Sequence, residues 1–185
     1  MHAHDLADAS QLMLRIASGD RAAFTVLARR LQGPALRLAD RTLQDRAAAE
    51  DVVQQALTRL WTEAARFDPA RGAAEAWFRR ILVNLCLDRR RSLKIVVPIE
   101  EAWDLASPDP DPLAASIAAD QRRRLDAAMA RLAPRQRLAL ALFHGQGLSM
   151  AEIAAELETT PKAIEGLLGR ARNELRSMLN ESPET

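Results

Sequence analysis

The feature that most constrains the fold of this chain is a proline-rich stretch near its middle, residues 92–112. It holds four of the nine prolines, and its run Ser-Pro-Asp-Pro-Asp-Pro, which ends at residue 112, cannot continue a helix. Proline lacks the amide hydrogen that an inner helical turn needs, and it disfavours helical backbone at the residue before it. We therefore expect two small domains, residues 1–91 and 113–185, joined by a linker over residues 92–112.

The composition on both sides of this linker predicts helices. Ala, Leu, Arg and Glu dominate, the 185 residues include 7 Gly and no Tyr, and β-branched residues are scarce outside short patches such as Ile95-Val96-Val97. Apolar residues make up 48% and charged residues 28% of the chain, which is the balance of a soluble globular protein. The predicted fold class is all-α, with two small helical domains and a Pro/Asp-rich linker between them.

Several function classes are excluded by what the sequence lacks. The single cysteine, Cys86, cannot form an intramolecular disulfide, and its apolar neighbours predict a small core residue. No apolar run approaches the ~20 residues that a bilayer span needs, and the N-terminus has no signal-peptide pattern, so we expect a cytoplasmic protein. His2, His4 and His144 have no acidic or cysteine partners at ligand spacing, and there is no glycine-rich phosphate loop. We therefore expect no enzyme activity, no metal and no cofactor.

The charges are segregated along the chain, although the net charge is only +1. Residues 79–94 contain six basic residues and one acidic residue, whereas residues 92–120 contain six acidic residues and one basic residue. This places a basic patch directly before an acidic connector. The arginine run at the helix end either contacts nucleic acid or is a solvated face that suits the helix dipole.

Capping residues and apolar spacing predict the first helices of the N-terminal domain. Ser10 can cap a short helix that Gly19 closes, and Asp20 can cap a longer one. We expect this second helix to break or kink at Gly33-Pro34, because proline inside a helix removes a hydrogen bond.

The remaining helices follow from apolar positions at three- and four-residue spacing. We expect helices over about residues 46–66 and 74–91, separated by the breaker loop 67–72. In the C-terminal domain we expect helices over residues 113–132 and 134–144.

A helix-turn-helix is the most informative local pattern. Ser149 and Glu152 form a capping box, in which each side chain accepts a hydrogen bond from the other residue's free amide at a helix start. Thr160 can cap a second helix with Pro161 in its first turn. A short helix, a three- or four-residue turn and a longer helix describe a helix-turn-helix, and an ordinary helical hairpin is the alternative.

The outer face of the second helix favours DNA binding over the hairpin. Lys162 and Glu165 lie near its start, where a recognition helix reads base edges, since Lys can donate to guanine and Glu can accept from cytosine. Basic residues further along would contact phosphates, which position the protein without reading sequence. They are Arg170, Arg172 and Arg176.

Three segments together resemble one family. Residues 50–61 (EDVVQQALTRLW) look like the polymerase-docking segment of sigma factors, and residues 76–91 (AWFRRILVNLCLDRRR) look like the adjoining promoter-reading helix. Residues 132–179 resemble the family's C-terminal domain. Over residues 11–179 the chain is similar to the compact extracytoplasmic-function (ECF) subgroup of bacterial sigma factors. The resemblance implies a protein that directs core RNA polymerase to promoters in response to a stress or environmental signal.

The resemblance also implies roles for individual residues. Docking on the coiled coil of the polymerase β′ subunit would involve Asp51, Gln54, Gln55, Leu57 and Trp61, although Leu57 and Trp61 also suit a core. Contacts to the −10 element would come from Phe67, Arg71, Phe78, Arg79, Arg80, Asn84, Arg89, Arg90 and Arg91, with Asn84 helping to capture an extruded base. Contacts to the −35 element would come from Thr160, Lys162, Ala163, Glu165, Gly166, Arg170, Arg172 and Arg176. The C-terminal domain would also contact the β flap, and an anti-sigma factor is the expected regulator.

The chain departs from the family pattern in its recognition helix. The family commonly has Thr-Val-Lys-Ser-Arg before an Arg-Ala-Arg, whereas this chain has Ala163-Ile164-Glu165-Gly166-Leu167. Two usual bases are lost and Glu165 is gained, which predicts an altered −35 preference or weaker DNA affinity. Aromatic residues that could stack on melted bases are also few, namely Phe67, Trp77 and Phe78, so we expect dependence on close matches at both promoter elements.

Alternatives remain open at this point. A sigma-like decoy would keep the fold, sequester an anti-sigma regulator and bind neither DNA nor polymerase. An ordinary helix-turn-helix repressor would need a ligand or dimerisation domain, which the sequence does not indicate. The acidic linker either mimics phosphates inside the polymerase channel, as the resemblance implies, or acts as a solvated tether.

Overall fold

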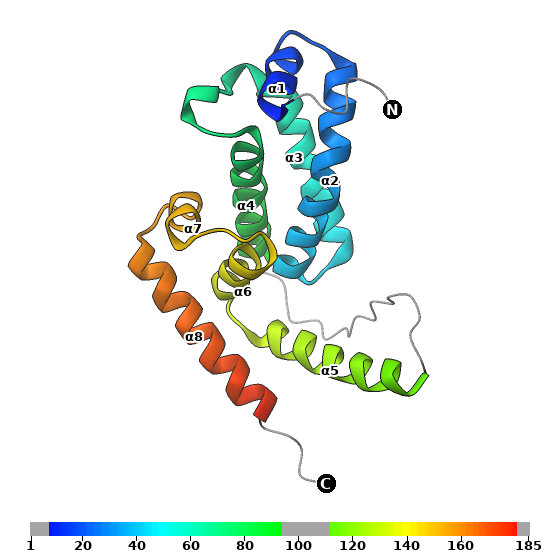
Figure 1. The fold of residues 1–185 in the computed structure, drawn as a ribbon, viewed down its shortest axis with the longest axis vertical. Coiled ribbons are helices and arrows are strands. Elements are labelled where there is room, and N and C mark those ends of the chain that lie inside the picture. Colours follow the sequence, from blue (N-terminus) through cyan, green and yellow to red (C-terminus); the bar gives the residue numbers. More distant parts are fainter. Residues whose placement is uncertain (1–7, 94–111, 181–185) are drawn as a thin grey trace. The chain divides into compact units, whose positions relative to one another are not determined.

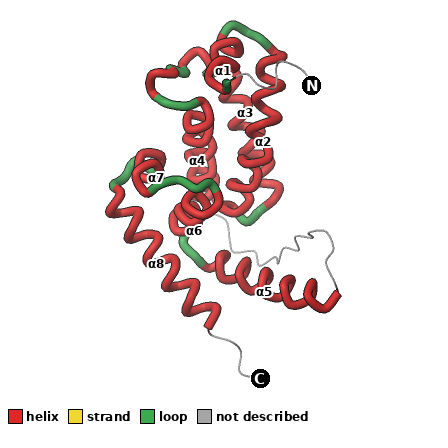
Figure 2. The backbone as a smooth tube through the Cα atoms, in the orientation of Figure 1, coloured by secondary structure: helices red, strands yellow, loops and turns green. Residues whose placement is uncertain are grey.

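The computed structural model describes residues 8–93 and 112–180, and every regular element in these two ranges is helical (Figures 1 and 2). The chain divides into two compact units, Met1–Ile95 and Val96–Thr185. This is the predicted all-α class with two small helical domains. The linker expected over residues 92–112 lies almost entirely outside the described residues.

Four α-helices build the first unit: α1 (Ala9–Ala17), α2 (Arg21–Leu43), α3 (Arg46–Thr62) and α4 (Ala74–Leu93). Helices α2, α3 and α4 pack against one another, and α1 packs on α2. Leu27, Leu60 and Leu82 are almost fully buried between them. Two short 3₁₀ turns, Ala64–Arg66 and Pro69–Arg71, connect α3 to α4.

The first helix begins earlier than expected. Asp8, not Ser10, precedes α1, since the carbonyl of Asp8 accepts the amide of Leu12 at 3.0 Å. Gly19 follows the helix with a φ of +88°, a backbone conformation that suits glycine. The prediction for Asp20 is confirmed, because its carboxylate accepts the amides of Ala22 and Ala23 at 2.9 and 3.0 Å.

No break occurs at Gly33-Pro34, where a break or a kink was expected. Helix α2 continues through Pro34 to Leu43. An interior proline costs a helix about 3 kcal/mol, but Leu31 and Ala35 on either side of this position are buried against the rest of the unit. We infer that this packing offsets the lost hydrogen bond.

Two other predicted helix ends also differ. Helix α3 ends at Thr62 and passes into the first 3₁₀ turn, whereas the apolar spacing predicted one helix to residue 66. Helix α4 continues to Leu93, slightly beyond the predicted end. The sequence pattern marks the buried positions, but it does not distinguish α-helical from 3₁₀ hydrogen bonding in a last turn.

The second unit contains α5 (Pro112–Arg131), α6 (Pro134–Leu140), α7 (Met150–Glu156) and α8 (Pro161–Asn180). Helix α6 passes into a π-helical turn, Ala141–Gly145, where a single α-helix had been predicted. Helices α5, α6 and α7 all pack against α8. Helix α8 is therefore in contact with each of the other three α-helices of the unit.

Two polar residues of α6 organise this packing. Arg137 is fully buried, and its guanidinium donates to the carbonyls of Met129 and Ala130 in the last turn of α5, at 3.2 and 2.6 Å. The neighbouring Gln136 donates its side-chain amide to Glu174 of α8 at 2.8 Å. Adjacent residues of one short helix therefore bind two different helices.

Two further observations concern the single cysteine and the possibility of a membrane span. Cys86 is fully buried, as predicted, and this burial raises the pKa of its thiol to about 12. Within the described ranges, no helix combines the length and the apolar composition required to cross a bilayer.

Candidate nucleic-acid interface

The helix-turn-helix is formed by α7 and α8, and its caps are those that the sequence predicts. The amide of Ser149 donates to the carboxylate of Glu152 at 2.8 Å, and the amide of Glu152 donates to the hydroxyl of Ser149 at 3.2 Å. The Ser149 hydroxyl also donates to the same carboxylate at 2.7 Å. This reciprocal capping satisfies two amides at the start of α7 and fixes where the motif begins.

The turn between the two helices is closed by backbone bonds. Glu158 has a φ of +51°, and the amide of Thr159 donates to the carbonyl of Ala154 at 2.9 Å. Thr160 then caps α8, because its hydroxyl accepts the amide of Ala163 at 3.2 Å. Pro161 occupies the first position of α8, where its missing amide is not needed.

One face of α8 is buried within its unit and the opposite face is exposed. Ile164, Leu168 and Ala171 are 0%, 1% and 0% exposed, so they anchor the helix to its unit. The predicted DNA-contacting side chains lie away from this stripe. Those with high exposure are Thr160, Lys162, Ala163, Glu165, Arg170, Arg172 and Arg176, while Gly166 is half-exposed.

Lys162 and Glu165 form an ion pair on the exposed face. The ammonium of Lys162 lies 2.8 Å from the carboxylate of Glu165, and the two side chains remain 87% and 56% exposed. The hydrogen bond from Lys162 lowers the pKa of Glu165, and the same bond raises the pKa of Lys162. The two residues expected to read bases are thus fully charged at neutral pH and bonded to each other.

Arg172 has an aromatic neighbour. Its guanidinium carbon lies 5.5 Å from the ring centre of Phe143, within the range of a cation–π interaction. Phe143 belongs to the π-helical turn that follows α6. This contact holds Arg172 near the turn while leaving it exposed.

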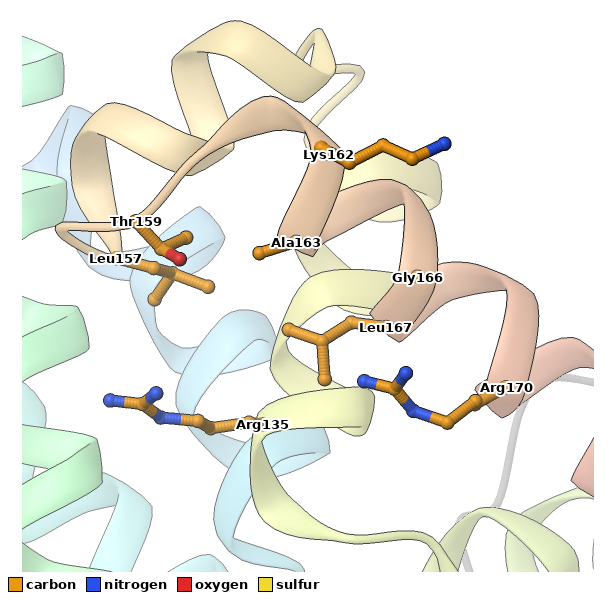
Figure 3. Close-up of a pocket in the computed structure, with 8 residues that line it drawn as sticks. All are labelled: Arg135, Leu157, Thr159, Lys162, Ala163, Gly166, Leu167 and Arg170. Carbon is orange, nitrogen blue, oxygen red and sulfur yellow. The ribbon is translucent and has the colours of Figure 1, made fainter.

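A shallow depression of about 290 Å³ lies beside α8 (Figure 3). Its lining residues include the predicted Lys162, Ala163, Gly166 and Arg170, together with Arg135 from α6. Arg135 is not among the residues predicted from the sequence. A single arginine in the first turn of a helix gives no local signal that the folded chain brings it beside a recognition helix.

The residues expected at the −10 element do not share one environment. Phe67 and Phe78 are 7% and 3% exposed, so neither offers a face on which a base could stack. Their assignment as DNA contacts is corrected for this conformation: both side chains belong to the core of the first unit. Trp77, half-buried, meets the Phe67 ring edge-on with ring centres 6.0 Å apart.

The polar residues of that set remain at the surface. Asn84 and Arg80 are both exposed and lie one turn apart on α4. Arg71 and Arg89 are also exposed, and Arg79 is half-buried. The side chains of Arg90 and Arg91 lie outside the described residues.

The predicted docking residues lie along α3. Asp51, Gln54 and Gln55 are exposed, and their spacing of three and four residues places them on one face. Leu57 and Trp61 are half-buried, and the Trp61 ring meets Phe24 of α2 edge-on with centres 5.3 Å apart. These two residues therefore combine a packing role with partial exposure.

A capped helix-turn-helix in one helical unit, with an exposed arginine–asparagine face on a helix of the other, defines a helical transcription protein that binds DNA. Comparison with known proteins narrows this class. Residues 27–95 match the family described as Sigma-70 region 2, and residues 122–175 match Sigma-70, region 4.

Full-length relatives agree with both matches. The chain is 30% identical over 176 residues to the ECF RNA polymerase sigma factor SigK of Mycobacterium tuberculosis, covering 94% of this chain and 92% of the relative. It is 33% identical over 180 residues to SigM of the same organism, covering 95% and 86%. The chain belongs to the family of ECF RNA polymerase sigma factors.

Two solved structures are similar over most of their length. One is CnrH in complex with the cytosolic domain of CnrY, with a TM-score of 0.69, 28% identity, and coverage of 95% of this chain and all of the other. The second is the sigma factor RpoE in complex with the anti-sigma factor NepR from Bartonella quintana, with a TM-score of 0.62, 27% identity, and coverage of 80% and 92%.

Proposed function

We propose that the two units divide the work of promoter recognition between them. As an ECF sigma factor, the chain directs core RNA polymerase to promoters. In the proposed division, residues 1–91 bind polymerase and handle the −10 element, and residues 113–185 read the −35 element. The proposed reading of the −35 element is supported by the capped helix-turn-helix, whose α8 buries one face and exposes a row of charged residues.

For α8 we propose a separation of roles along the helix. Thr160, Lys162, Ala163, Glu165 and Gly166 lie at its start, where a recognition helix faces base edges. Arg170, Arg172 and Arg176 lie further along and would neutralise phosphates, which gives affinity without sequence preference.

For the first unit we propose two surfaces. The exposed Asp51, Gln54 and Gln55 on α3, with the accessible parts of Leu57 and Trp61, would dock on the β′ coiled coil. Arg71, Arg79, Arg80, Asn84 and Arg89 would engage the −10 element, and Arg90 and Arg91 extend this set by sequence alone. The β flap is the proposed partner of the second unit.

We further propose that the chain acts in the cytoplasm with polymerase, by binding alone and without a cofactor. An anti-sigma factor is the proposed regulator, and the similarity to a sigma factor solved with the anti-sigma factor NepR supports this. The acidic residues at 100–111 would serve either as phosphate mimics or as part of a tether. Deleting residues 100–111 distinguishes the two: a tether predicts weaker binding avidity, whereas a channel element predicts altered initiation and promoter escape with DNA binding retained.

Run-off transcription with purified core polymerase tests the main proposal. The template is a promoter selected from a random duplex pool by the chain bound to core polymerase. We expect transcription that depends on the chain and falls strongly when Gln54 and Gln55 are both changed to Ala. Gln32→Ala, an exposed glutamine on α2, is the matched control. A chain that fails to associate with core polymerase in the absence of any regulator would refute the proposal in favour of the decoy.

A further inference from the structure

Phe143 is an aromatic residue that lies outside α8 and contacts one of its arginines. It belongs to the π-helical turn Ala141–Gly145, and its ring centre lies 5.5 Å from the guanidinium carbon of Arg172. Phe143 is half-buried, whereas Arg172 is exposed. The pair therefore joins a side chain anchored in the unit to a charged side chain that a ligand can reach.

The turn that carries Phe143 is fixed by its backbone. Leu142 is fully buried, and its carbonyl accepts the amides of Gln146 and Leu148 at 3.3 and 3.2 Å. The ring of Phe143 also lies nearly perpendicular to the ring of His144, with ring centres 5.0 Å apart. An arginine side chain has several rotatable bonds and more conformational freedom. The fixed ring therefore restricts where the guanidinium lies.

Arg172 keeps hydrogen-bonding capacity for a ligand while it contacts the ring. Over residues 8–93 and 112–180, it takes part in no ion pair. The ring attracts the guanidinium through the negative charge of its face, and it meets the cation from one side only. A guanidinium has five N–H donors. Those directed away from the ring can donate to phosphate oxygens while the ring contact persists.

Arg170 offers a comparison on the same helix. Successive residues of an α-helix are about 100° apart, so Arg170 and Arg172 lie about 200° apart around α8, on opposite flanks of its exposed face. Arg170 lines the depression of Figure 3 together with Gly166 and Leu167, and none of the residues that line it is aromatic. The ring contact therefore distinguishes Arg172 from a second arginine with the same proposed role.

We infer that Phe143 is a positioning residue for promoter binding, whose ring holds the guanidinium of Arg172 in place for one backbone phosphate of the −35 DNA. The inference rests on the proposed −35 binding by α8. Because the ring restricts Arg172 before DNA arrives, less side-chain freedom is lost when the phosphate binds. An exposed cation–π contact corresponds to about a 2- to 5-fold change in an equilibrium constant, which sets the expected size of the effect.

The test measures the DNA affinity of the full chain in complex with core polymerase, using the selected promoter duplex. Phe143→Leu keeps an apolar side chain but removes the ring, and it should weaken binding by about 2- to 5-fold. The same change should weaken binding equally in a chain that carries Arg170→Ala, the matched control. It should have no further effect in a chain that carries Arg172→Ala. Phe143→Tyr, which keeps the ring face, should retain the affinity of the unmodified chain.

A second series changes the charge of the ring and leaves its packing in place. Phe143 is replaced by phenylalanines with an increasing number of ring fluorines, which reduce the negative charge of the ring face and nearly preserve its shape. DNA affinity should fall stepwise along this series. In the chain with Arg172→Ala it should stay constant, because no guanidinium is left to respond to the ring.

The outcomes separate this inference from the proposed function. If Phe143→Leu weakens binding as much with Arg172→Ala as without it, the ring supports only the fold of the turn and the inference is refuted. A constant affinity along the fluorine series also refutes the inference, while −35 recognition stands. If Arg172→Ala binds DNA as the unmodified chain does, the proposed phosphate contact fails first. If the unmodified complex shows no sequence-dependent binding, the proposed function itself fails.

Discussion

Glu165 is the residue of the recognition helix whose replacement tests the base-reading role most directly. It stands where the family commonly has a lysine, and in the structure its carboxylate accepts a hydrogen bond from Lys162 at 2.8 Å. The conservative change is Glu165→Gln, which keeps the shape of the side chain and removes its charge. This change also leaves Lys162 without its carboxylate partner.

The expected change in base preference depends first on how exposed the Lys162–Glu165 ion pair is. Both side chains are largely exposed, and ion pairs of this kind contribute little to stability, so DNA can separate them at small cost. The contacts between residue 165 and the bases then determine the sequence preference. Glutamate suits cytosine as an acceptor, whereas glutamine binds adenine through two hydrogen bonds, and a good contact discriminates by about 5- to 150-fold at one base pair. We expect the preferred base to change at one −35 position by a factor in this range, with the other positions unaffected.

The assay is selection of promoter duplexes from a random pool by the chain bound to core polymerase, followed by sequencing. The lowered pKa of Glu165 keeps its carboxylate charged throughout the neutral range. The preference of the unmodified chain should therefore stay constant with pH until the medium is more acidic than the ordinary pKa of a glutamate. A uniform loss of affinity in Glu165→Gln at every position, with no change in preference, would refute base reading by Glu165.

Three further predictions address the rest of the interface and the core. Changing Arg170 and Arg172 together to Ala should weaken binding to all sequences and reduce the salt slope by roughly one unit per lost phosphate contact, measured by titration at several salt concentrations. An unchanged slope would contradict phosphate binding by these arginines. Ser149→Ala removes the cap of α7 and should lower the free energy of unfolding by about 1 kcal/mol in urea denaturation, whereas an unaltered midpoint would mean that the cap adds nothing. Cys86, whose thiol stays protonated below a pKa of about 12, should resist alkylation at neutral pH and react once denaturant exposes it; rapid alkylation of the folded chain would contradict its burial.

The sequence predicted those elements that depend on local chemistry. Asp20, Ser149 and Thr160 each accept amide hydrogens as expected, because a cap requires only its own helix turn. The all-α class and the helix-turn-helix follow from the same local rules together with helical spacing of apolar residues.

Features that depend on tertiary neighbours could not be predicted in this way. Pro34 is tolerated because buried residues flank it, and nothing within its own turn indicates that. Phe67 and Phe78 read equally well as stacking platforms or as core residues until the fold places them inside. Arg135 joins the candidate site only through the approach of α6 to α8.

The side chains of Gln136 and Arg137 have a consequence for how the second unit unfolds. Gln136 binds Glu174 of α8, and Arg137 binds the last carbonyls of α5. Rotating or fraying this single turn of α6 therefore releases both helices together. Partial opening of one helix alone is thereby disfavoured, and the unit should melt in one cooperative step. In hydrogen exchange, the slowest amides of α5 and α8 should then share a common opening free energy, although they lie far apart in the chain.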